Sequence, residues 1–219
     1  MDPLSRMILA AAATAGSTGP RPTVVGTGES EGTTNKTSLQ ISLPAGVQDG
    51  DLMVAFLAAG GGSRDVGDWA NTGWTWAVEY TTAPNLAVAY RVASSEGASV
   101  TFTTTNDCKL SGVVRVFRGA TWGVTGTPGT GSSSTVTAPG ITVIDNNSIL
   151  LGHFALKDDN ITWTNNTGMT KVEELDEDNY VHSYYIVTSD VDGGATGDKS
   201  MGSNKSNSYQ AVLVSISPT

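Results

Sequence analysis

The stretch PAGVQDGDLMVAFLA at residues 44–58 contains, in order, a proline, a polar turn built on Asp and Gly, and a continuous apolar run. Much later in the chain, PGITVIDNNSILLGHFA at residues 139–155 repeats this order. Apolar runs of this length between turn residues are typical of strands that are buried on both faces. The two stretches therefore predict two buried strands at equivalent places in a duplicated fold.

Further segments repeat in the same order along the chain. GWTWAVEY at 73–80 is matched by GMTKVEEL at 168–175, VAYRVASS at 88–95 by SYYIVTSD at 183–190, and VVRVFRG at 113–119 by AVLVSIS at 211–217. The repetition predicts two similar halves, residues 23–120 and 121–219, which together form a domain 23–219 after an N-terminal segment 1–22.

Composition and periodicity predict an all-β fold. Charged residues make up only 15% of the chain and 26 residues are Gly, which favours short strands joined by turns. Apolar residues alternate in several segments, for example at Leu39, Ile41 and Leu43. We expect an antiparallel β-sandwich, jelly-roll-like, built from the two internally similar halves.

Two arrangements of the halves fit this pattern. Each half forms an independent sandwich in one, and in the other the halves interleave as the two sheets of one large sandwich. The spacer GATWG at 119–123 is short and leads directly into the second half. Because separate domains are usually joined by longer, flexible linkers, the single sandwich is favoured.

The charge and the rare residue types exclude several functions. The formal net charge is −9 and Lys and Arg form no cluster, so the chain offers little to a nucleic-acid backbone. The single cysteine, Cys108, excludes an intrachain disulfide. The two histidines, His153 and His182, stand in strand-like segments outside any H-E-x-x-H pattern, and no G-x-S-x-G motif is present. We therefore predict no catalytic residue, no cofactor and no enzymatic activity.

The segment DVDGGATGD at 190–198 resembles a calcium-binding loop in its alternating acids and glycines. It lacks the regular third acid and the glutamate at the twelfth position that such loops use. A glycine-rich turn explains the same residues, so no metal site is predicted.

The tryptophans divide into two groups. In residues 74–80 the alternating positions are interpreted as core; these are Trp74, Trp76, Val78 and Tyr80. Trp69 and Trp163 stand instead in loop-like segments rich in Asn, Asp, Thr and Gly. An indole face beside short polar side chains is what stacking on a sugar ring requires, although a loop plug would use the same residues. We predict glycan contact at Trp69 and Trp163.

The N-terminal segment carries the apolar sequence MILAAAATAG at 7–16. It is too short to cross a bilayer, and its weak A-x-A pattern leaves a secretion signal as an alternative. Pro20 and Pro22 separate it from the strands that follow. We expect residues 3–15 to form a short helical or extended arm that anchors the protein to a neighbouring subunit or to a second copy, with docking on its own domain as the alternative. Its anchoring residues are Leu4, Met7, Ile8 and Leu9.

The strand pattern of residues 44–120, together with its second copy, resembles the β-sandwich proteins common among bacteriophage virion proteins, which decorate heads, tails or fibres. The resemblance implies a non-enzymatic structural protein on the virion surface that contacts other virion subunits, copies of itself and cell-surface glycan. It implies no contact with nucleic acid or membrane, and it fixes no site residue. The alternative is a secreted or cell-surface, lectin-like carbohydrate-binding module.

Overall fold

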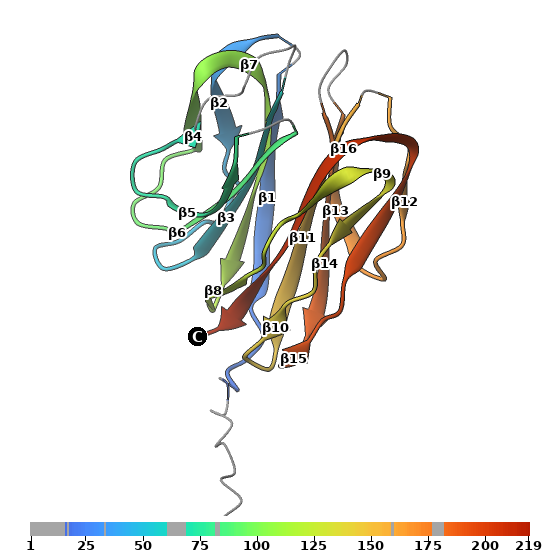
Figure 1. Cartoon of the computed structure of the whole chain (residues 1–219). Helices are drawn as coiled ribbons and strands as arrows, with labels where there is room; N and C mark the ends of the chain where they lie inside the picture. The colour runs from blue at the N-terminus through green and yellow to red at the C-terminus, as the bar shows by residue number, and fades with distance from the viewer. Residues whose placement is uncertain are drawn as a thin grey trace, which may run out of the picture.

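The molecule is an antiparallel β-sandwich, as the sequence predicts. The computed structural model describes residues 16, 18–32, 34–60, 69–81, 84–158, 160–176 and 182–219, and no helix occurs among them. Figure 1 shows two sheets side by side, one from each half of the chain. The strands of the first half are β1 (Thr23–Glu31), β2 (Lys36–Ser42), β3 (Leu52–Gly60), β4 (Trp69–Ala70), β5 (Thr75–Tyr80), β6 (Asn85–Val92) and β7 (Ser99–Arg118).

The second half repeats the topology of the first. Its strands are β8 (Ala120–Thr125), β9 (Gly129–Ala138), β10 (Thr142–Val143), β11 (Ser148–Lys157), β12 (Trp163–Asn165), β13 (Thr170–Asp176), β14 (His182–Val191), β15 (Gly194–Ala195) and β16 (Lys199–Pro218). The closing strand β7 pairs with β1, β2, β3 and β4, and β16 pairs with β8, β9, β11 and β12. All strand pairs within the described residues join two strands of one half, so each half builds its own seven-stranded sheet.

The irregularities of the sheets are repeated as well. The register of β5 against β6 shifts between Trp76 and Val78, and the register of β13 against β14 shifts between Lys171 and Glu173. A β-bulge of this kind is a specific local feature that is normally retained for a structural reason. The match makes Trp76 and Lys171 equivalent positions of the two halves.

The bulge at Ala77 separates the aromatic residues that alternation places on one face. Trp74 and Trp76 pack with the core on the outer face of the sheet, whereas Val78 and Tyr80 pack with the core on its inner face. The extra residue turns the second pair to the opposite side. Interpreting all four as one face is therefore wrong.

Three apolar cores among the described residues hold the molecule together. The central core lies between the two sheets and takes side chains from both halves, including Leu52 and Phe56 from β3 and Leu151 from β11. Each half also has an outer core on the other face of its sheet, around Phe102 in the first half and Met201 in the second. The two sheets thus face one another, and each also carries its own outer layer.

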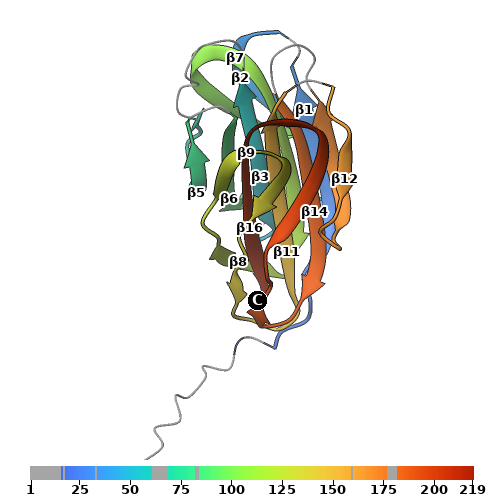
Figure 2. The same cartoon turned by 45° about the vertical axis from the view of Figure 1, so that its right-hand side comes forward.

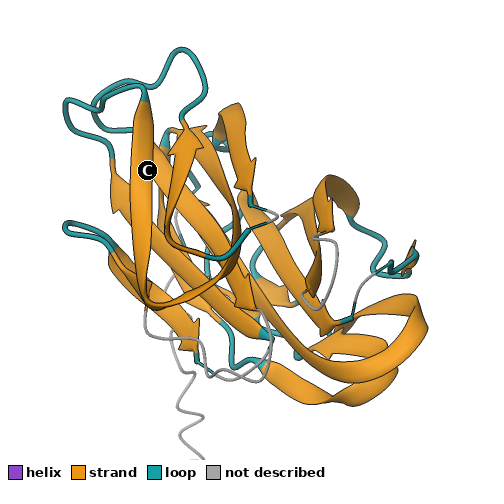
Figure 3. Cartoon of the chain, turned by 90° about the horizontal axis from the view of Figure 1, so that it is seen from above, coloured by secondary structure: helices purple, strands orange, loops and turns teal. Residues whose placement is uncertain are grey.

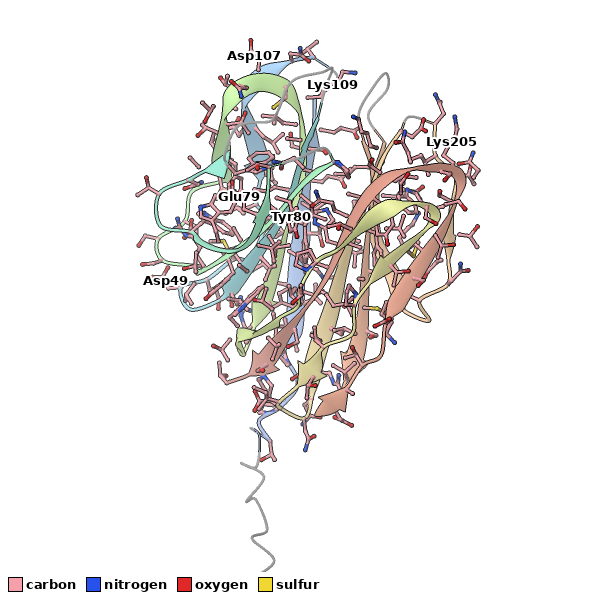
Figure 4. The ribbon with its side chains drawn as sticks, viewed as in Figure 1. Asp49, Glu79, Tyr80, Asp107, Lys109 and Lys205 are labelled. Atoms are coloured by element: carbon pink, nitrogen blue, oxygen red, sulfur yellow. The ribbon has the colours of Figure 1, made fainter. Side chains whose placement is uncertain are left out.

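The closing strands connect these layers by bending. The first part of β7 pairs with β2 and β4 and buries Phe102 in the outer core, whereas its last part pairs with β1 and β3 and buries Phe117 centrally. Figure 2 shows the corresponding arch of β16, and Figure 3 shows the molecule from above as strands and loops. In Figure 4, Asp107 and Lys109 mark the arch of β7, and Lys205 marks that of β16.

An ion pair fixes the turn in the opening stretch. The Nε and Nη2 atoms of Arg118 each donate to the buried Asp51 carboxylate at 2.9 Å, and the backbone N–H of Gln48 donates to it at 2.9 Å. Burial alone would raise the pKa of Asp51, but these hydrogen bonds outweigh it and lower the pKa. The pair ties the end of β7 to Asp51, the residue before Leu52 of β3. The equivalent residue in the second half is Ser148.

His153 lies inside the central core, although the sequence suggests a solvated face. It points away from Leu150, as alternation predicts, but the sheet of the first half covers this face and leaves only 1% of His153 exposed. Its ring contacts Phe56 edge to face, with 5.5 Å between centroids. Burial lowers the pKa of His153 to about 3, so the imidazole is neutral at physiological pH.

The described chain begins and ends at one end of the molecule, which we call the base. Arg21 Nη1 donates to the carbonyl oxygen of Ser148 at 2.9 Å and lies 3.1 Å from Asp190. Asn147 Nδ2 donates to the carbonyl oxygen of Gly19 at 3.0 Å, so the linker is held on the second half. The C terminus lies at the same end (Figure 1). The predicted arm falls outside the described residues, with its anchors Leu4, Met7, Ile8 and Leu9.

Two carboxyl groups meet across the seam between the halves. A hydrogen bond between Glu29 on β1 and Glu173 on β13 raises the pKa of Glu29, and burial and the charges of Glu173 and Glu31 raise it further. The folded protein therefore holds this proton more tightly than the unfolded chain. The stability gained from the pair is fully present below the ordinary glutamate pKa and is lost as the pH rises through the raised pKa.

Replacing Glu29 by Gln should remove this pH dependence. In Glu29→Gln the amide donates to Glu173 at every pH, so at pH 8 we expect a gain over the wild type of at most about 1 kcal/mol, because the site is exposed. At pH 4 the gain should vanish. Urea unfolding at both pH values measures the difference in unfolding free energy between variant and wild type, with Asp107→Asn on the β7 arch as the control. A variant less stable than the wild type at pH 8 would contradict the assignment.

Candidate functional site

The first half carries an open pocket of about 590 Å³ on its outer layer. Strands β4, β5 and β7 and the turn after β4 form it. Its lining residues are Trp69, Ala70, Asn71, Thr72, Trp76, Thr101 and Thr103. The lining thus combines two indole rings with short, uncharged polar side chains.

Strand pairing places the polar wall. Trp69 lies opposite Thr104 and Ala70 lies opposite Thr103, so β4 runs along the first part of β7. Along β7 the side chains alternate, with Phe102 buried and Thr101 and Thr103 exposed. The two threonines therefore stand on the solvent side of the layer whose other side forms the outer core.

Trp69 is the fixed wall of the pocket. Only 3% of it is exposed. Its Nε1–H donates to Oδ1 of the fully buried Asn85 at 2.7 Å, and its backbone N–H donates to Oε1 of Glu79 at 2.6 Å. The bond from the indole to Asn85 fixes the ring orientation, and the bond to Glu79 holds the backbone. Trp69 lines the pocket, as a predicted contact residue should, but most of its ring is packed inside the protein.

Trp76 is the indole with more exposed surface. It is half-buried on β5 and packs edge to face on Phe102, with 6.2 Å between centroids and an interplanar angle of 66°. Phe102 packs in turn against Trp74 at 5.0 Å. The aromatic cluster supports Trp76 from behind, so its ring forms a firm apolar surface at the pocket.

Sequence reasoning missed Trp76 because it treated the residue as core. The repeat contains the signal that could have found it. At the equivalent position the second half has Lys171, which is exposed and pairs with Glu174 at 3.2 Å. A position that accepts an exposed lysine in one half is not a deep core position in the other.

The polar side chains are partly oriented by the backbone. Asn71 Nδ2 donates to the carbonyl oxygen of Thr101 at 2.6 Å, and Thr103 Oγ1 donates to the carbonyl oxygen of Ala70 at 3.3 Å. Each of these groups keeps hydrogen-bonding capacity, since an amide oxygen and a hydroxyl oxygen accept further bonds. Donors and acceptors therefore stand beside the Trp76 ring.

The structure does not bring the two predicted tryptophans together. Trp163 lies on β12, at the outer side of the second half, and β4 lies at the outer side of the first (Figure 1). The two positions are equivalent, because Trp69 is opposite Thr104 and Trp163 is opposite Ser203. Trp163 is packed partly on the second outer core. Its half has Lys171 in place of the Trp76 platform.

The acids of residues 190–198 serve the turns around them. Asp192 accepts the backbone N–H of Asn147 at 3.0 Å, Asp198 accepts that of Gly140 at 2.8 Å, and Asp190 pairs with Arg21. Within the described part of the chain, His, Cys, Asp and Glu side chains form no group of three that could hold a metal ion. Cys108 is buried.

Comparison of the chain with protein-family models, with curated proteins and with solved structures finds no match. Over the described residues, no helix combines the length and the hydropathy needed to cross a membrane. The function must therefore be argued from the pocket and the fold.

Removing the acceptor behind Trp69 should destabilise the protein measurably. In Asn85→Ala the buried indole N–H loses its partner, which costs about 1–3 kcal/mol. Urea unfolding measures this loss. Asn71→Ala is the control, because its amide bonds the carbonyl of Thr101 near the surface and its removal should cost less than about 1 kcal/mol. Equal losses in both variants would contradict the role given to Asn85.

Proposed function

We propose that this protein is a non-enzymatic structural protein of a virion surface, whose pocket at Trp76 contacts a neutral carbohydrate. The observation that carries the proposal is the combination of a supported, partly exposed indole with Asn71, Thr101 and Thr103 around one open pocket. An indole face packs on the apolar face of a pyranose ring, and short polar side chains bond its hydroxyl groups.

The lining supports a neutral sugar and a binding role. Among the described residues, the lining contains no Lys or Arg to pair with an acidic sugar, and the net charge of −9 disfavours anions generally. The described part of the lining also has no carboxylate, imidazole or thiol of the kind that transfers protons or attacks a substrate. The pocket therefore has the chemistry for recognition.

The linker and the pocket lie toward opposite ends of the molecule, which suits display of the pocket on a particle. The linker and the C terminus lie at the base, whereas β4, at the pocket, lies toward the other end in Figure 1. In this proposal the arm binds a neighbouring virion subunit or a second copy through Leu4, Met7, Ile8 and Leu9. The sandwich then presents the pocket to solvent. A lectin-like module without the anchoring role would use the same pocket.

Carbohydrate binding is tested at Trp76. A glycan array should identify a neutral sugar, and Trp76→Ala should weaken its binding at least about tenfold, since an aromatic contact is worth about 1.5 kcal/mol. Thr103→Val tests the polar wall without removing the ring. Lys171→Ala, at the equivalent place in the second half, is the matched control and should bind like the wild type. Calorimetric titration measures the affinities. Absence of binding across the array, or equal losses at Trp76 and Lys171, would overturn the carbohydrate proposal.

The anchoring role is tested by truncation. A chain that lacks residues 1–16 should keep its circular dichroism spectrum but should no longer be incorporated into particles. Quantitative gel analysis of purified particles measures the occupancy. Full occupancy by the truncated chain would show that the arm is not the anchor, and would favour the lectin-like alternative if the glycan is still bound.

A further inference from the structure

The base of the seam carries an apolar surface that is open to solvent. Tyr90 on β6 stacks on Trp122 of β8 at 4.2 Å with nearly parallel rings, and both are only partly buried. Val92, two residues further along β6 and thus on the same face, is 58% exposed. We call Tyr90, Val92 and Trp122 the seam patch. It joins the two halves at the end of the molecule where the described chain begins.

The fold itself does not require apolar residues at this place. Val92 lies opposite Leu52, and the corresponding pair in the second half is Asp190 opposite Ile149. By the same register, the residue at the position of Tyr90 is Thr188, three residues further along the chain than the sequence match of 88–95 with 183–190 predicts. The second half thus folds with polar residues where the first half exposes Tyr90 and Val92.

In the second half, the N-terminal part of the described chain contacts the equivalent place, although the Asp190 side chain stays 70% exposed. Arg21 reaches Asp190 and the carbonyl oxygen of Ser148, and Gly19 accepts a hydrogen bond from Asn147. Gly16 lies so close to Ile144 and Asp145 that a Cβ would find no room. The polar residues of the N-terminal segment therefore contact Asp190, the polar residue that stands in the second half where the first half has Val92.

We propose that the apolar part of the same segment, residues 1–15, covers the apolar position, so that in the free protein the arm docks on the seam patch of its own chain. Leu4, Met7, Ile8 and Leu9 supply the apolar side chains. The inference goes beyond the proposed function, because it concerns the free chain and does not depend on the ligand of the pocket.

The arm is long enough to reach the patch. The eight residues from Ile8 to Gly16 span up to about 27 Å when extended. Trp122 lies on β8, two strand spacings from β11 through β16, which corresponds to about 10 Å across the sheet. A short tether also keeps the local concentration of the arm at its own patch near millimolar, which favours this docking over binding to a second copy in dilute solution.

Disulfide trapping tests the docking in the full-length chain. In a Cys108→Ser background, the pair Ile8→Cys and Val92→Cys places one thiol on the arm and one on the seam patch. The control pair is Ile8→Cys with Thr121→Cys, because Thr121 is exposed at the base but points to the opposite face of β8 from Trp122. Non-reducing gels with thiol-specific mass labels follow the oxidation at micromolar protein.

The expected result is an intramolecular disulfide that forms at least about tenfold faster at Val92 than at Thr121. Equal rates at the two sites would show that the arm does not select the patch, and a disulfide-linked dimer would show that it binds a second copy. Either result overturns the proposal. As a second measurement, truncation of residues 1–15 should increase binding of a hydrophobic dye, and Val92→Ser in the truncated chain should reverse the increase. An unchanged dye signal on truncation would likewise overturn the proposal.

Discussion

The central core between the two sheets is the constraint on which the rest of the structure depends. Each sheet is apolar on both faces, since all nine residues of β3 and nine of the ten residues of β11 are buried. The outer face is covered by strands of the same half, but the inner face can be buried only against the other half. Burial of one Phe or Leu contributes about 1.5–3 kcal/mol, and side chains such as Phe56, Phe117 and Leu151 come from both halves. The two halves therefore stabilise each other, although they exchange no strand among the described residues.

Much of this fold could be predicted because burial on both faces leaves a strong signal in sequence. The continuous apolar runs that became β3 and β11 indicated central strands, and the repeated order of segments indicated the duplicated topology. The bulge at Ala77 and the burial of His153 could not be predicted. Both are set by strands that lie far away in sequence, and alternation within one segment contains no information about what covers each face.

The candidate site shows the same division between local and non-local causes. A loop-like segment containing Trp69 was recognisable, but the burial of its ring follows from Asn85 and Glu79, which approach it only in the folded chain. Trp76 looked like core because the alternating pattern continued through the bulge. Trp163 was predicted with Trp69 on composition alone, and the topology places the two on opposite sides of the molecule. The arm residues lie outside the described part of the chain.

Because the two halves obey the same folding constraints, their differences are more informative than their similarities. The repeat retains the strand order, the bulges and the apolar cores, which every copy of this fold needs. It changes partly or fully exposed positions that the fold leaves free. Trp76 corresponds to Lys171 and Val92 corresponds to Asp190, and in each case the first half has the apolar residue at the surface. A contiguous apolar patch, more than a single exposed side chain, marks a surface that contacts something else. The two differences fall in the pocket that is proposed to bind carbohydrate and in the seam patch that is proposed to bind the arm, so both proposals rest on residues of the first half.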